Sequence, residues 1–82
     1  MPTARAALSR GQPALALSAL DQHQREHPAG RLGEERDALR VQVLVRLARA
    51  TDAQAAALAF RSRYPGSLLQ TSVDTAIRSI QQ

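Results

Sequence analysis

The chain repeats itself with an offset of 37 residues, and this repeat restricts the possible folds more than any other feature. When the sequence is shifted by that distance, small, aliphatic, ring-bearing and proline positions of the first half fall on similar positions of the second. The aligned pairs are Ala7 with Leu44, Leu8 with Val45, Ala16 with Ala53, Leu20 with Ala57, His23 with Phe60, His27 with Tyr64, Pro28 with Pro65 and Leu32 with Leu69. A repeated unit of this length is typical of helical hairpins that stack, because one hairpin cannot bury its apolar face alone.

Composition and helix signals together predict an all-α fold. Alanine and leucine dominate the 82 residues, which include one Phe, one Tyr and no Trp, and this favours close-packed helices over a sheet. We expect one domain over residues 1–82, forming part of a larger protein and built from two helical hairpins and a C-terminal capping helix. The first repeat covers about 1–32, the second about 33–69 and the capping helix about 67–80. The five helical segments are expected over about 3–10, 13–27, 33–49, 51–63 and 67–80.

Several residues mark where these helices begin and end. Gly11 is a common residue just after a helix C-terminus, and Pro13 suits the first turn of the next helix. Ser67, followed three residues later by Gln70, predicts a capping box at the start of the last helix.

The third segment is expected to be apolar over most of its circumference. Its apolar residues leave a narrow polar stripe that consists of Glu35, Gln42, Arg46 and Arg49. A helix that is apolar over most of its circumference usually lies between neighbouring helices. We therefore expect this helix at the centre of the fold.

Two histidines raise the question of a metal site. His23 and His27 are four residues apart, so both imidazoles lie on one face of a helix, as a zinc site would need. The repeat favours packing instead, because the aligned positions hold Phe60 and Tyr64. No further side chain is spaced to complete a metal site. We expect the histidines to pack, and a pH-sensitive packing role stays open.

The sequence contains no pattern that indicates catalysis. There is no cysteine, which excludes disulfides and thiolate metal sites, and no nucleophile motif or glycine-rich phosphate loop occurs. The acids Glu34, Glu35 and Asp37 lie at a helix start, where they favour the helix dipole. We expect a non-enzymatic protein without cofactor or metal. No apolar run reaches the length of about 18 residues that a membrane-spanning helix needs.

At this point the first repeat resembles the tetratricopeptide family. Gly11, Ala16, Leu20 and Pro28 match the family's spacing of small residue, alanine, bulky residue and proline. The second repeat departs from that spacing, because Phe60 is followed by proline after five residues. Its segment "FRSRYPGS" looks like the variant repeats of bacterial envelope proteins. The chain from "HPAGRL" to "GSLL" is also similar to tetratricopeptide-like domains of myxobacterial and related regulatory proteins.

The resemblance implies a TPR-like stack that acts as a protein–protein interaction module, a scaffold or adaptor domain in the cytoplasm or periplasm of a bacterium. In this family the first helix of each hairpin lines a groove that binds peptides. For the third segment, this places Arg36, Arg40 and Val43 at the candidate partner-binding surface, where the arginines would hold an acidic peptide or a carboxylate terminus. The lysine–asparagine clamp of chaperone-binding members is absent, since the chain contains neither residue.

Two other function classes stay open. The short first helix leaves an apolar edge that a second copy of the chain would cover in a homodimer. The formal net charge of +4, carried by arginine alone, raises nucleic acid as a partner. The arginines are scattered among acids, however, and no recognition-helix pattern is present, so the sequence does not favour nucleic acid.

Overall fold

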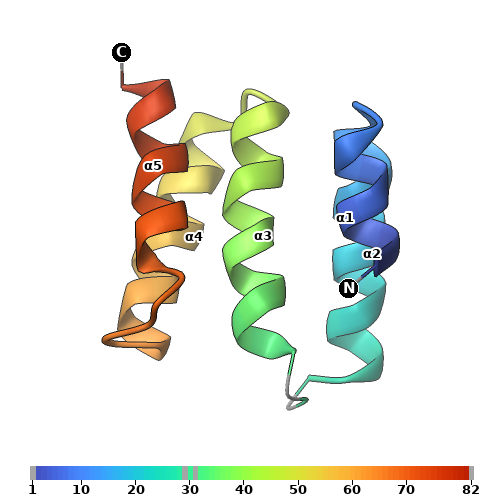
Figure 1. Cartoon of the computed structure of the whole chain (residues 1–82), viewed down its shortest axis with the longest axis horizontal. Helices are drawn as coiled ribbons and strands as arrows, with labels where there is room; N and C mark the ends of the chain where they lie inside the picture. Colours follow the sequence, from blue (N-terminus) through green and yellow to red (C-terminus); the bar gives the residue numbers. More distant parts are fainter. Residues whose placement is uncertain (1, 29, 31, 82) are drawn as a thin grey trace.

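The structure, a computed structural model, describes residues 2–28, 30 and 32–81. These residues form five α-helices and no strand (Figure 1), which confirms the all-α prediction. The helices are α1 (Pro2–Ser9), α2 (Pro13–Glu26), α3 (Gly33–Arg46), α4 (Ala50–Arg63) and α5 (Gln70–Ile80). Within the described ranges, no helix combines the length and the apolar character that crossing a membrane requires.

The 37-residue repeat of the sequence is also a repeat of the backbone. Helices α2 and α4 begin and end at positions that differ by 37, and so do the first residues of α3 and α5. The residues that end α2 and α4 have nearly the same backbone angles, with φ −137° and ψ 62° at His27 and φ −126° and ψ 63° at Tyr64. Each of their N–H groups donates to the carbonyl oxygen four residues earlier. The first helix of each hairpin is therefore followed by an equivalent second helix and loop.

Both hairpins turn on the same backbone motif. Gly11 after α1 has φ 72°, and Ala48 after α3 has φ 59°. At each turn this residue donates its N–H to the carbonyl three residues earlier, and the next residue donates to the carbonyl five residues earlier, with N···O distances of 2.9 to 3.0 Å. This is the Schellman arrangement, which satisfies the last carbonyls of a helix. In the second turn an alanine, Ala48, occupies the left-handed position that is usually a glycine.

Two of the expected helix ends are wrong. The third helix ends at Arg46 rather than near 49, because the left-handed backbone at Ala48 stops it. The last helix begins at Gln70, and its first residues make no capping box. Ser67 instead accepts the N–H of Leu69 at 3.0 Å, which stabilises a turn before the helix. Gln70 donates to Asp74 one turn further along at 2.8 Å, so its side chain is not available for capping.

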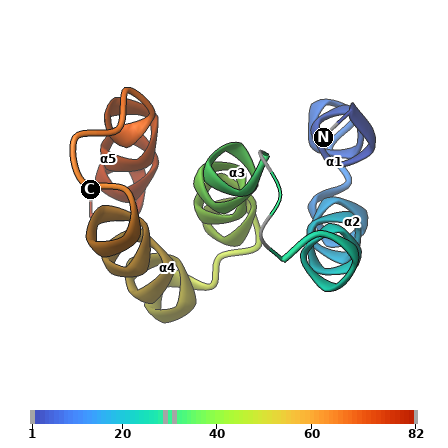
Figure 2. The same cartoon turned by 90° about the horizontal axis from the view of Figure 1, so that it is seen from below.

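The helices form two layers with α3 at the centre. Figure 2 shows α1, α3 and α5 in one layer and α2 and α4 in the other. Helix α3 packs against α2, α4 and α5, and its Leu39 and Val43 also share a buried cluster with Ala4 and Ala7 of α1. The expectation that the third helix lies between its neighbours is therefore correct, since burial of its apolar side chains drives the packing.

Helix α5 differs from α3 on the side that would face a further helix. On this side α3 carries two buried residues in the cluster that it shares with Phe60 of α4 and Val73 of α5, whereas the aligned residues of α5 are polar and exposed. The aligned pairs are Ala38 with Thr75 and Val41 with Arg78. A polar outer face is what the terminal helix of a stack needs for solubility, so it fits the predicted role of α5 as a capping helix.

We expect reciprocal effects from exchanging the residues at the two turns. Ala48→Gly should raise the free energy of unfolding by about 1 kcal/mol, because glycine adopts the left-handed backbone without the steric cost of a Cβ atom. Gly11→Ala should lower it by about the same amount. No atom lies within 4 Å of a Cβ built at Gly11, so the loss would come from the backbone alone. Urea unfolding of both variants tests this, and a destabilising Ala48→Gly would contradict it.

Candidate functional site

Two of the three residues predicted to bind a partner are buried. Arg36 is 1% exposed and Val43 is 0% exposed. Val43 packs with Leu39 in the cluster that joins α3 to α1 and α2. The repeat alignment contained a signal for this, because Arg36 aligns with Val73, which is also buried. Neither Arg36 nor Val43 is at the surface, so a partner would have to bind through other residues.

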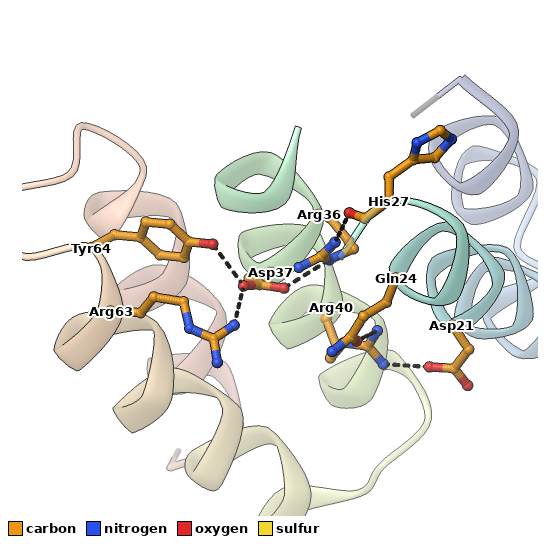
Figure 3. A network of polar contacts seen from close by, with 8 residues as sticks. All are labelled: Asp21, Gln24, His27, Arg36, Asp37, Arg40, Arg63 and Tyr64. Carbon is orange, nitrogen blue, oxygen red and sulfur yellow. Dashed lines mark hydrogen bonds and ion pairs between the residues drawn. The ribbon is translucent and has the colours of Figure 1, made fainter. Parts of the chain in front are cut away.

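Arg36 belongs to a polar network that joins three segments of the fold (Figure 3). Its Nε lies 3.0 Å from Oδ1 of Asp37, and its Nη1 donates to the carbonyl oxygen of His27 at 3.3 Å. The other carboxylate oxygen of Asp37 accepts from Nη1 of Arg63 at 3.2 Å and from the hydroxyl of Tyr64 at 3.0 Å. Through these contacts, Arg36 and Asp37 connect the end of α2, the first turn of α3 and the end of α4.

The tyrosine of this network stays a hydrogen-bond donor. Burial raises the pKa of Tyr64, and its hydrogen bond to Asp37 raises that pKa further. The hydroxyl therefore keeps its proton at neutral pH and donates to the carboxylate. This supports a structural role for Tyr64 at the start of α3.

Arg40 is also engaged within the protein, although part of it reaches the surface. Its side chain is 19% exposed, and its Nη1 donates to Oδ1 of Asp21 at 2.6 Å. Its Nη2 donates to the side-chain oxygen of Gln24 at 2.9 Å. Both partners lie on α2, so Arg40 connects α3 to α2 (Figure 3). A partner would have to compete with these contacts to bind Arg40.

A groove lies instead on the layer formed by α1, α3 and α5. It has a volume of about 440 Å³, and Figure 2 shows α1 and α5 on either side of α3 in this layer. The lining residues include Leu8 of α1, Gln42 and Arg46 of α3, and Ser72, Thr75 and Ser79 of α5. A smaller hollow of about 80 Å³ shares Gln42 and Ser72 with it and is bordered by Arg5 and Glu35. The polar stripe of the third segment thus lies largely along this groove.

The two ends of the groove differ in charge. Arg5 of α1 forms an ion pair with Glu35 of α3 beside the smaller hollow. Arg46, at the end of α3, is exposed and has no acidic partner among the ion pairs of the described residues. A group of negative charge would therefore be favoured at the Arg46 end.

Sequence reasoning missed the hydroxyl side of this groove. Ser72, Thr75 and Ser79 are spaced three and four residues apart, which puts them on one face of α5. That spacing was a usable signal. It did not indicate which helix the hydroxyl face would oppose, because that depends on how α5 packs against α3.

The two histidines have the geometry of the aligned aromatic pair. The ring centroids of His23 and His27 are 5.2 Å apart, and those of Phe60 and Tyr64 are 5.1 Å apart, both in tilted arrangements. Nδ1 of His23 is buried without a hydrogen-bond partner within the described protein. Among the described residues, no group of three or more His, Cys, Asp or Glu side chains is arranged to hold a metal ion. The geometry favours the packing interpretation for His23, whereas His27 is exposed.

Comparison with known proteins identifies no relative: no protein family matches the chain, and no curated protein or solved structure matches it. The resemblance to tetratricopeptide repeats therefore stays a prediction that rests on the residues quoted for it.

We expect Arg36 to be among the most sensitive positions of the fold. Arg36→Ala should lower the free energy of unfolding by about 3 kcal/mol, because it removes the largest fully buried side chain and its hydrogen bonds to Asp37 and to the carbonyl of His27. Arg63→Ala removes an exposed partner of the same carboxylate and should cost less than about 1 kcal/mol. Chemical denaturation of both variants measures the difference, and equal effects would contradict the assigned role of Arg36.

Stability should also depend on pH through His23. Burial lowers the pKa of His23 below 6.5, and the positive charges of His27 and Arg36 lower it further, against a smaller opposing effect of Glu26. The folded protein then binds this proton less readily than the unfolded chain does. The contribution of His23 is complete above about pH 6.5 and is lost as the pH falls from there toward the folded pKa.

The matched variant for this prediction is His23→Phe, which installs the residue of the aligned position. Urea unfolding between about pH 5 and pH 8 should show a smaller loss of stability on acidification in this variant than in the wild type. Identical pH profiles of the two proteins would show that His23 does not contribute.

Proposed function

We propose that this chain is a non-enzymatic protein–protein interaction module that binds a segment of its partner in the groove between α1, α3 and α5. The observation that carries the proposal is the unused hydrogen-bonding capacity of the groove. Gln42, Ser72 and Thr75 line it, and the side-chain hydrogen bonds within the described protein include none of these three residues. Amide and hydroxyl groups both donate and accept, so they suit the backbone of a peptide.

The architecture supports this function in a second way. Helix α3 supplies the floor of the groove through its polar stripe, while its other faces are held by neighbours on three sides. A surface on such a buried helix loses little conformational freedom when it binds, which lowers the cost of association. An adaptor or scaffold domain of a larger bacterial protein, as the tetratricopeptide resemblance implies, would use a surface of this kind.

Homotypic assembly is the second candidate function. Leu58 on α4 and Leu68 in the loop before α5 are large apolar side chains that are exposed in the single chain. Burial of such side chains between two copies would favour a homodimer. Sedimentation of the protein alone separates this candidate from a groove that binds another protein.

A matched pair of tryptophan variants tests the groove. Ser72→Trp places a bulky side chain at the point that both hollows share, and Ser18→Trp makes the same change at an exposed position of α2. The immobilised wild-type domain should retain a partner from a lysate of the source organism. With that partner purified, Ser72→Trp should weaken binding at least about tenfold, because it excludes the partner from the groove.

The Ser18→Trp control should bind as the wild type does. Circular dichroism of both variants checks that they keep their helices. If the partner binds equally to the two tryptophan variants, the groove is not its binding site, and the proposed function fails at that surface.

A further inference from the structure

The end of the molecule that carries the hairpin turns is rich in arginine. The α1–α2 turn, the α3–α4 turn and the end of α5 all lie at the upper end of Figure 1. Arg10 lies in the first turn, Arg46 and Arg49 flank the second, and Arg78 lies in the last turn of α5. We call these four residues the arginine rim. All four are exposed, and none of them takes part in the ion pairs of the described residues.

The acidic residues are distributed differently. Asp52 in the first turn of α4 is the acid of the described residues that lies near the rim in sequence. Glu26 ends α2, and Glu34, Glu35 and Asp37 lie in the first turns of α3, at the opposite end of the stack. Arg25, Arg61 and Arg63 lie in the last turns of α2 and α4 at the same end and offset these acids. The two ends therefore differ in net charge, because Asp52 is the only acid of the described residues at the end that carries the four arginines of the rim.

Helix stabilisation does not account for the whole rim. A cation near a helix C-terminus is favoured by the helix dipole, and this explains Arg46 and Arg78. Arg49 is the N-cap residue of α4, where the same dipole disfavours a positive charge. Arg49 therefore adds a third positive charge to this end of the molecule without stabilising α4, the helix that it begins.

The groove opens onto the rim. Arg46 belongs to both, because it ends α3 and lines the groove beside Ser79. The opposite end of the groove is bordered by the ion pair of Arg5 and Glu35, which offers no unpaired positive charge. The geometry points to a partner segment that carries its negative charges at the rim and continues into the groove toward Arg5.

We propose that the partner is an acidic polypeptide segment, which the arginine rim attracts and which the groove then holds. This inference rests on the proposed function and adds the chemistry and direction of the bound segment. Clustered arginines recognise acidic motifs through charge-assisted hydrogen bonds. The amide and hydroxyl groups beyond Arg46 then hydrogen bond to the backbone of the segment.

The same surface suits nucleic acid less well. Proteins that bind single strands combine cations with aromatic side chains on which the bases stack. The chain has one Phe and one Tyr. Phe60 is buried, and Tyr64 is held by Asp37 at the end of α4, away from the rim. The rim therefore has charge without a stacking surface.

Two triple variants with the same change in net charge test this inference. The rim variant is Arg10→Gln/Arg46→Gln/Arg49→Gln, and the control is Arg25→Gln/Arg61→Gln/Arg63→Gln, whose three arginines are also exposed. In the control, Arg61 and Arg63 each lose one exposed ion pair, with Asp74 and Asp37, and such pairs contribute little to stability. The probes are a short glutamate-rich peptide, its glutamine counterpart and a single-stranded DNA oligonucleotide of equal charge. Fluorescence anisotropy measures their affinities at low and physiological salt, and circular dichroism confirms that each variant is folded.

We expect the wild type to bind the glutamate-rich peptide and to bind the glutamine peptide more weakly. The rim variant should lose about tenfold in affinity, the sum of three exposed ion pairs of ordinary strength, whereas the control should stay within about twofold of the wild type. Physiological salt should weaken the wild type more than the rim variant. Ser72→Trp should also weaken peptide binding.

Other results would overturn the inference. Equal losses in the two triple variants would show that net charge alone matters, and tighter binding of the oligonucleotide would identify the rim as a nucleic-acid surface. If Ser72→Trp weakens peptide binding and the rim variant does not, the inference fails and the proposed function stands. If the rim variant weakens binding and Ser72→Trp does not, the groove fails as the binding site and the inferred path along it fails too.

Discussion

The contact between the buried Arg36 and the half-buried Asp37 is the centre of a polar network that joins the start of α3 to both second helices. Its atoms reach the end of α2 through the carbonyl of His27 and the end of α4 through Arg63 and Tyr64. A buried guanidinium is costly to desolvate, so it is tolerated only where its donors and its charge are satisfied. The network therefore fixes the first turn of α3 relative to both second helices, and the position of the groove follows from the position of α3.

The two repeats place different residue types at the same packing positions. At the first junction the ring pair is His23 and His27, and the residue of the next helix beside it is Arg36. At the second junction the ring pair is Phe60 and Tyr64, and Val73 occupies the position that aligns with Arg36. The second junction is therefore mainly apolar, whereas the first contains titratable rings beside a permanent charge. The shifted pKa of His23 therefore predicts a pH dependence below about pH 6.5 at the first junction, whereas the raised pKa of Tyr64 concerns only alkaline pH.

The groove and the core use opposite faces of the same helix, and this links fold to function. The apolar faces of α3 are covered by α1, α2, α4 and α5, and its polar stripe is left between α1 and α5. Arg40, on another face, connects α3 to α2 through Asp21 and Gln24. Binding on the stripe would leave these contacts intact, so recognition and stability need not compete. The charge difference between the two ends of the stack would then give the bound segment its direction.

The sequence by itself determined the helices, their repeat and the central place of α3, because these depend on local signals. Periodicity, proline and glycine positions and the 37-residue offset act within one or two helices. It also contained the polar stripe of Glu35, Gln42 and Arg46. The end of α3 at Arg46 and the start of α5 at Gln70 were harder to predict. A left-handed backbone at Ala48 ends α3, and a turn at Ser67 takes the place of the expected capping box.

Only the tertiary structure decided which polar residues remain at the surface. Arg36 and Arg40 are both charged residues on α3, and apart from the alignment of Arg36 with the buried Val73, the sequence does not show that both bind within the protein. Their contacts come from α2 and α4, which are distant in sequence. The hydroxyl groups of α5 likewise face Gln42 and Arg46 only because α5 packs beside α3. Burial and apposition are properties of packing between segments, and therefore the site was decided by the fold while the helices were decided by the sequence.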